Sequence, residues 1–351
     1  YSNDFSIENL EVIRRYQSNE DNVFFAYSEF SYNTLVGAYE PFLDIICNMH
    51  RRFIGGSFDE FQKECGVYYL HRQVLNSYYE TGECFREETV LLNEVAYEQR
   101  RMTMAIVDML KRLSEVKPLM IVINRFQMAS KSSIETIKYL IDHPCTNIGI
   151  VLGVNANVKG ADSTVEVWDR IVESLEDRSA IYYIGSARPL RNSEKPTDDD
   201  ELYVTTNFEQ SIQEASNTME FLDYEQAKRG CRIIEHKIKF EDAWIDEKSL
   251  KRFYMVYART SVLLGELSKA LELTNEYRAL IQEKNSEHDL SLFYFMKGTC
   301  YMYQGKLDKA EVCAKKAYDY ALLAKDDMLE FKTELLSVMI KMSGWYNIFF
   351  C

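Results

Sequence analysis

The sequence predicts an α/β domain built on a parallel sheet, followed by an all-α region of repeated helical hairpins. Residues 119–123 form an apolar run without alternation, which is typical of a strand buried on both faces of a parallel sheet. Further apolar runs at 23–27 and 147–155 are separated from it by segments with helical periodicity. After about residue 202 such runs stop, and a self-similar unit recurs at spacings of 43 and 40 residues. These observations together define the predicted fold class.

The α/β domain is expected over residues 1–190, with strands and helices alternating along the chain. In order, the expected elements are a helix at 7–16, a strand at 23–27, a helix from 42 to about 53, helices within 57–116, a strand at 119–123, a helix at 133–141, a strand at 147–155, a helix at 165–175 and a strand at 180–184. The segment 191–201 contains a proline and an acidic run, and it is the predicted linker.

Residues 202–351 are predicted to form helices in repeated pairs. The repeated unit reads Leu222-Asp223-Tyr224-Glu225-Gln226-Ala227, Gly265-Glu266-Leu267-Ser268-Lys269-Ala270 and Gly305-Lys306-Leu307-Asp308-Lys309-Ala310. Small residues recur where paired helices must approach closely, namely Ala215, Ala258 and Gly298 in the first helix and Ala227, Ala270 and Ala310 in the second. With Tyr301, Ala314 and Ala317, the third unit resembles a tetratricopeptide repeat (TPR). The resemblance implies a TPR-like helical solenoid.

A fourth unit starts near Leu335 and reaches Cys351 without the polar outer face that closes a repeat array. We therefore expect the natural protein to continue beyond this residue, with the present chain as its amino-terminal portion.

A further pattern follows the apolar run at 119–123. It reads Asn124-Arg125-Phe126-Gln127-Met128-Ala129-Ser130 and leads to Ser132-Ser133 at the start of a helix, while a small-Tyr-x-Pro-Phe motif lies upstream at 38–42. Together these motifs resemble the STAND class of P-loop NTPases, whose Walker B strand ends in two acids and is followed by Gln-Trp-Ala-Asp and Ser-Ser. The resemblance implies a parallel-sheet, AAA-like ATPase domain of the maltose-regulon-activator or cyclase-associated type.

The chain departs from this family at the residues that bind the metal ion and the phosphates. Asn124 and Arg125 replace the two acids, and Ser130 stands in place of the Asp. A carboxylate at the strand end holds Mg²⁺ in such enzymes, which a guanidinium cannot do. The phosphate-binding motif GxxxxGK[ST] is missing from the 351 residues. We therefore predict a vestigial site at these three positions, with no catalytic residue, no metal and no cofactor; ATP is the ligand that the resemblance alone would suggest.

Two alternatives remain open. One is an active ATP-dependent STAND switch whose phosphate-binding loop lies outside this sequence, before Tyr1, and whose magnesium acid comes from elsewhere. Glu135 and Asp142 lie near the strand in sequence, but on the helix that follows it. Asn155 stands roughly where active relatives sense the γ-phosphate, although an Asn that ends a strand at a turn is the simpler interpretation. The other alternative is a helix-covered sheet that is unrelated to nucleotide-binding domains.

Composition excludes several classes of function. The net charge is −14, from 55 acids and 41 bases, and an acidic surface repels nucleic-acid phosphates. The sequence contains no apolar segment of membrane-spanning length and no signal pattern at its start, so we expect no membrane association and a cytoplasmic location. The eight cysteines form no CxxC pair and are expected to be buried thiols. The five histidines are expected at the surface or the core edge, outside any catalytic arrangement.

These observations favour a non-catalytic regulatory module over an enzyme. The resemblances imply the interaction portion of a larger protein in signal transduction or transcription regulation. The groove of a TPR-like array offers a site for a protein partner or a small ligand, and the repeats also offer surfaces for self-association.

Overall fold

The computed structural model describes residues 22–30, 36–84, 94–153, 207–240, 245–281 and 286–349. The chain divides into two compact units, Tyr1–Gln226 and Ala227–Cys351. This division falls inside a helix, whereas the predicted linker at 191–201 lies outside the described residues. The elements predicted at 7–16, 165–175 and 180–184 lie outside them as well. The two units are described separately below.

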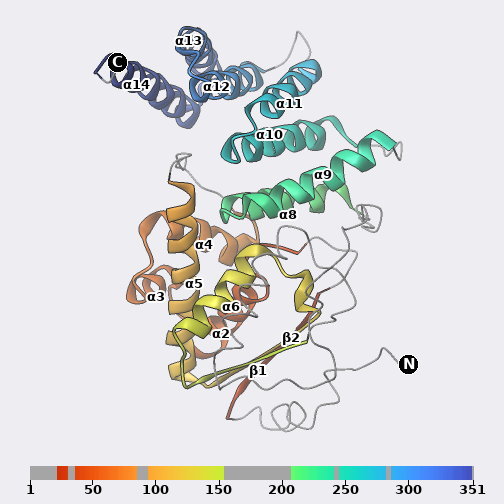
Figure 1. Cartoon of the computed structure of the whole chain (residues 1–351), viewed down its shortest axis with the longest axis vertical. Helices are drawn as coiled ribbons and strands as arrows, with labels where there is room; N and C mark the ends of the chain where they lie inside the picture. The colour runs from red at the N-terminus through yellow and green to blue at the C-terminus, as the bar shows by residue number, and fades with distance from the viewer. Residues whose placement is uncertain are drawn as a thin grey trace. The chain divides into compact units, whose positions relative to one another are not determined.

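The first unit contains a parallel sheet of three described strands. They are β1 (Phe24–Glu29), β2 (Leu119–Asn124) and β3 (Ile148–Leu152), and they lie side by side in chain order. In register, Ala26 lies opposite Ile121, which lies opposite Ile150. The predictions of parallel strands in these three places are confirmed (Figure 1).

The central strand β2 is buried along its length, as its unbroken apolar sequence predicted. Residues 119–123 are all buried, and only Asn124 at the carboxyl end is half-buried. Met120 and Val122 pack on one face with Phe25, Tyr27 and Val151 from the neighbouring strands. Since successive side chains of a strand point to opposite faces, the other β2 residues face the helices that Figure 1 shows above the sheet.

The helices of this unit follow the predicted order. They are α2 (Phe42–Met49), continued by a π-helical turn (His50–Ile54), α3 (Phe58–Glu64), α4 (Tyr69–Thr81), α5 (Val95–Val116), a 3₁₀ turn (Phe126–Met128), α6 (Lys131–Asp142) and α8 (Phe208–Glu220). α2 packs against α5, which packs against α6. Serines cap two of these helices at the start, because Ser57 and Ser130 accept hydrogen bonds from backbone amides of the first turn.

The helical region consists of α9 (Tyr224–Phe240), which begins in the first unit, and α10 (Glu247–Leu263), α11 (Leu267–Leu280), α12 (Glu287–Tyr303), α13 (Leu307–Ala324) and α14 (Asp327–Phe349). From α10 onward each helix packs against the next, as Figure 1 shows. Among the described residues, no helix combines the length and the apolar character that crossing a membrane requires.

The repeated unit found in the sequence is a repeated helix-ending turn. Leu222, Gly265 and Gly305 all have a left-handed backbone, with φ of 69°, 76° and 72°. At each, the residue's own amide bonds to the carbonyl three residues back, and the next amide bonds to the carbonyl five residues back. This is the Schellman arrangement, in which glycine avoids the strain of a left-handed conformation. The spacings of 43 and 40 residues therefore correspond to three turns of the same geometry.

The small residues of the repeat are buried where the helices meet. Ala215, Ala227, Ala258, Ala270 and Ala310 are each at most 3% exposed. A Cβ added at Gly298 would lie 3.2 Å from Leu336 Cδ2, 3.3 Å from Cys313 Cβ and 3.4 Å from the Ala310 carbonyl oxygen. Only a residue without a side chain fits there comfortably, so Gly298 fixes how closely α12 approaches α13 and α14.

Candidate functional site

The predicted site lies at the carboxyl end of the sheet. Asn124 ends β2 directly opposite Glu29, the last residue of β1. The Asn124 side-chain oxygen accepts a hydrogen bond from the Arg125 amide, directly after the strand, at 3.0 Å. This side-chain oxygen is therefore bound to the backbone.

Arg125 leaves the strand in a left-handed conformation, with φ of 56°. Its Nη2 atom lies 3.1 Å from Oε1 of Glu29, and the Tyr27 hydroxyl donates to Oε2 of the same carboxylate at 3.0 Å. The end of β2 thus carries a cation that is ion-paired with the acid at the end of the neighbouring strand β1. Sequence reasoning missed Glu29, because only the register between β1 and β2 places it beside Arg125.

Ser130 lies at the start of α6, in a buried group of hydroxyls. Its Oγ lies 3.0 Å from Oγ of Ser132 and 2.8 Å from Oγ of Ser133. Ser132 Oγ accepts a hydrogen bond from the Tyr39 amide at 2.9 Å, and Ser133 Oγ donates to the Glu40 carbonyl at 2.6 Å. The small-Tyr-x-Pro-Phe motif and the Ser-Ser motif are therefore bonded directly to each other, although more than 90 residues separate them.

A carboxylate from a distant segment completes this group. Oδ2 of Asp223 accepts a hydrogen bond from the Ser132 amide at 2.9 Å, and Oδ1 of Asp223 lies 3.4 Å from the Gln226 amide. Both amides belong to the first turn of a helix, where backbone donors lack helical partners and favour negative charge. Gln226 Nε2 donates to the Val36 carbonyl at 3.0 Å, and Gln99 Nε2 donates to the Leu222 carbonyl at 2.6 Å. The turn at 221–226 is thus part of the α6 site.

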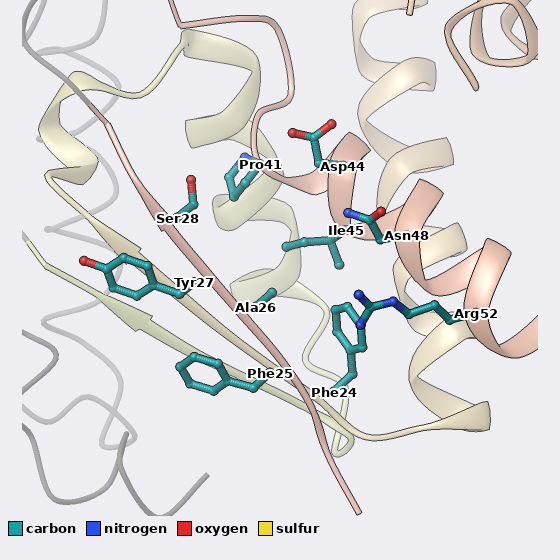
Figure 2. A pocket seen from close by; sticks show the side chains of 10 residues that line it. All are labelled: Phe24, Phe25, Ala26, Tyr27, Ser28, Pro41, Asp44, Ile45, Asn48 and Arg52. Atoms are coloured by element: carbon teal, nitrogen blue, oxygen red, sulfur yellow. The ribbon is translucent and has the colours of Figure 1, made fainter. Parts of the chain in front are cut away.

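A cleft of about 350 Å³ lies beside this site, between β1 and α2 (Figure 2). Asp44, Asn48 and Arg52 line it from α2 and the following turn, at intervals of four residues that place them on one face. The Arg52 guanidinium carbon lies 5.8 Å from the centre of the Phe24 ring. The cleft therefore offers one cation, one acid and one amide along an apolar strand.

Acidic groups gather near one end of the cleft. Burial raises the pKa of Glu40 to about 7, against a hydrogen bond from the Gly37 backbone, and the nearby Asp44 and Glu214 raise it further. Burial also raises the pKa of Asp44, although a hydrogen bond from the Tyr78 hydroxyl at 3.3 Å opposes the shift. These shifts favour the neutral carboxylic acids, which are poor ligands for cations. In the part of the chain that the structure describes, no group of three or more His, Cys, Asp or Glu residues is placed to hold a metal ion.

The prediction that the histidines lie at the surface or core edge is wrong for His50 and His71, which are fully buried. Nδ1 of His50 lies 3.1 Å from the Tyr79 hydroxyl, among the rings of Phe58 and Phe61. Nε2 of His71 lies 3.1 Å from Oε2 of Glu98. Each has a polar neighbour on another helix that the sequence could not place beside it.

The cysteines of the described residues are free thiols, and most are buried as predicted. Cys65 and Cys145 are half-buried rather than fully buried, because each lies near the end of a helix. Cys351 lies outside the described residues. Burial raises the pKa of Cys47, Cys65 and Cys300 to about 12, so these thiols are held in the unreactive protonated form.

Asn155 and Gln127 complete the predicted positions. Asn155 lies outside the described residues, as does the side chain of Gln127. Glu135 and Asp142 lie on α6, where Glu135 forms a long, half-exposed contact of 4.0 Å with Lys138.

Comparisons of the chain with protein-family models, with curated proteins and with solved structures found no match.

Proposed function

We propose that this chain is the non-catalytic regulatory and interaction portion of a signalling or transcription-regulating protein. Its sheet domain is a STAND-like domain that has lost hydrolysis, and its helical pairs form a TPR-like array that binds a protein partner or a small ligand. We place the protein in the cytoplasm, where its free thiols stay reduced.

One observation carries the loss of hydrolysis. Arg125 occupies the end of β2 and is ion-paired with Glu29 at 3.1 Å. Mg²⁺ needs oxygen ligands and is drawn to a carboxylate at such a strand end. Here Glu29, the carboxylate opposite Asn124, already has a guanidinium and the Tyr27 hydroxyl as partners. A metal ion would have to displace the cation before it could bind.

The helical region supports the interaction role. Three turns of one geometry and small residues at close helix contacts are what a stacked array of hairpins requires. Ion pairs also connect one hairpin with the next, since Lys269 lies 3.0 Å from Glu235 and Lys251 lies 3.0 Å from Asp289. An array held in this way presents a continuous surface of several helices to a partner.

Isothermal titration of the full-length protein with ATP and Mg²⁺, together with a phosphate-release assay, tests the proposal. We expect no turnover. Micromolar binding with turnover would overturn the non-catalytic function.

A second candidate, the active ATP-dependent switch, is favoured by Glu29, which is an acid at the correct edge of the sheet. In that case Glu29 would leave Arg125 and hold the metal, in the place that Glu135 and Asp142 were considered for. Glu29→Gln would then abolish turnover, whereas Glu135→Gln, a matched change on α6, would not. If the full-length protein shows no turnover, either as wild type or as Glu135→Gln, the switch is excluded.

A further inference from the structure

The last helix, α14, has apolar residues on two opposite faces. Its inner face packs on α12 and α13 through Leu336 and Ile340, which contact Met302, Ala310 and Ala314. Its outer face carries five large apolar residues that are exposed by 38–57%, namely Met328, Phe331, Leu335, Val338 and Met342. A helix that is apolar on both sides is normally covered on both sides. The outer row of α14, which we call the seam, therefore has the composition of an interface.

The spacing of the seam identifies the kind of partner. Its residues are separated by three, four, three and four positions, which is the pattern that keeps one stripe facing another helix in a coiled coil. The stripe is narrow and straight and extends for roughly 21 Å, at 1.5 Å per residue. Such a stripe fits a second helix lying alongside, better than it fits an irregular surface or a strand.

The charges beside the seam indicate a second copy in antiparallel orientation. Asp327, Glu334 and Lys341 lie along one flank at intervals of seven residues. This flank is acidic at the start of the helix and basic at the end. An antiparallel copy brings Lys341 of each chain beside Glu334 of the other. A parallel copy would pair Asp327 with Lys332 of the other chain, but it would place Glu334 opposite Met339 and Lys341 opposite Tyr346. Only the antiparallel arrangement gives both Glu334 and Lys341, at the middle and end of the flank, an opposite charge.

We propose that two copies of this chain associate through the seam of α14, antiparallel and around a two-fold axis. Leu335 of one copy packs against Val338 of the other, and Phe331 packs against Met342. Each contact then occurs twice, as a two-fold interface requires. A coiled coil of two heptads is short, but α14 is already held as a helix by α12 and α13, so association need not order it first. This association does not depend on the loss of hydrolysis proposed above.

Sedimentation equilibrium of the full chain tests the proposal. We expect a dimer at micromolar concentration, and at least a tenfold increase in its dissociation constant for Val338→Glu. Val312→Glu is the matched control, since Val312 is exposed by 57% on α13 and lies outside the seam, against 51% for Val338. Circular dichroism should show unchanged helicity in both variants. A wild-type chain that stays monomeric at about 100 µM, or a Val338→Glu dimer as tight as the wild type, overturns the proposal.

A charge exchange tests the orientation and the identity of the partner together. Lys341→Glu makes the flank acidic throughout, and Glu334→Lys makes both facing positions basic, so each variant alone should dimerise at least tenfold more weakly. Mixed in equal amounts, they restore opposite charges at both contacts and should form a heterodimer. If mixing does not restore association, the antiparallel second copy is excluded, and another helix or protein must cover the seam.

Discussion

The sheet unit and the helical unit differ in how far along the chain their polar contacts reach. In the sheet unit, local serine caps are joined by bonds to distant segments, since Asp223 accepts a hydrogen bond from the Ser132 amide in the first turn of α6 and Ser133 donates to the Glu40 carbonyl. In the helical unit, the chain closes its own helices through the left-handed turns at Gly265 and Gly305. Long-range polar contacts specify one arrangement, because each donor needs its particular acceptor. Local turns can be repeated as often as the chain repeats their sequence.

The same difference determines what each unit leaves at its surface. The polar groups at the sheet edge bind one another, as Arg125 and Glu29 do. The helical unit closes its turns locally and keeps small residues between its helices, while large apolar residues of α14 stay exposed. The described polar groups at the sheet edge are thus paired within the first unit, whereas the second unit keeps an exposed apolar row on α14.

The largest effect is expected from Gly298→Val, which tests whether close helix approach holds the helical unit. The added side chain would collide with Cys313, Leu336 and the Ala310 carbonyl. We expect the free energy of unfolding to fall by about 3 kcal/mol, as for strong overpacking. Urea unfolding followed by circular dichroism measures it. Gly298→Ala should cost less, since a single methyl can be accommodated by shifts of a few tenths of an ångström. Equal stability of wild type and Gly298→Val would mean that α12 and α13 are free to separate.

Asp223→Ala removes the long-range cap of the sheet unit and is expected to cost about 2 kcal/mol. The change leaves two first-turn amides, of Ser132 and Gln226, without their carboxylate in a buried site. The matched control is Asp246→Ala, since exposed Asp246 caps only its own helix, α10, through the Ser249 amide at 2.9 Å. Chemical denaturation should show a clearly smaller loss for the control. Equal losses would remove the distinction between distant and local capping.

The sequence predicted the local features of both units well, because they depend on neighbouring residues. The unbroken apolar run at 119–123 became the buried strand β2, and the repeated unit became three turns of one geometry. Gly298 was predicted to lie at a close helix contact, and it does. In each case hydrophobic pattern or glycine conformation acts within a few residues.

The candidate site was predicted only in part. Asn124, Arg125 and Ser130 lie at the strand end and helix start, as their order along the chain indicated. The partners of Arg125 and of the neighbouring Ser132 could not be predicted, because Glu29 and Tyr39 come from segments more than 90 residues earlier. Asp223 was interpreted as part of a repeat, and its bond to Ser132 crosses 91 residues. Such pairs depend on strand register and on tertiary packing, and neither can be predicted from the local sequence pattern.

Glu40→Gln tests whether ionisation of the buried Glu40 carboxyl destabilises the sheet unit. The pKa of Glu40 is about 7 in the folded chain, against an ordinary value of 4.5. Between these pH values the unfolded chain releases the proton and the folded chain keeps it, so stability falls as pH rises from 4.5 to about 7. The variant should lose this slope, so its stability relative to the wild type should rise by up to about 3 kcal/mol between pH 4 and pH 8. Unfolding measured from pH 4 to pH 8 tests this.

Glu214→Gln is the comparison for Glu40→Gln. Burial raises the pKa of Glu214 as well, so its variant should change the slope in the same direction. A Glu40→Gln variant that keeps the full pH dependence would show that Glu40 is not the titrating group.

The smallest effect is expected at Arg125, because its half-exposed ion pair should add little to the stability of the sheet unit. Arg125→Gly removes an ion pair whose side chains are 39% and 35% exposed, which is worth less than about 1 kcal/mol. It also removes the strain of a left-handed non-glycine residue, which is worth about the same. The two should cancel within about 0.5 kcal/mol in urea unfolding. Arg125→Val loses the pair and keeps the strain, so it should be the less stable variant. If Arg125→Gly is as damaging as Asp223→Ala, the ion pair at the strand end supports the fold as strongly as the buried cap does.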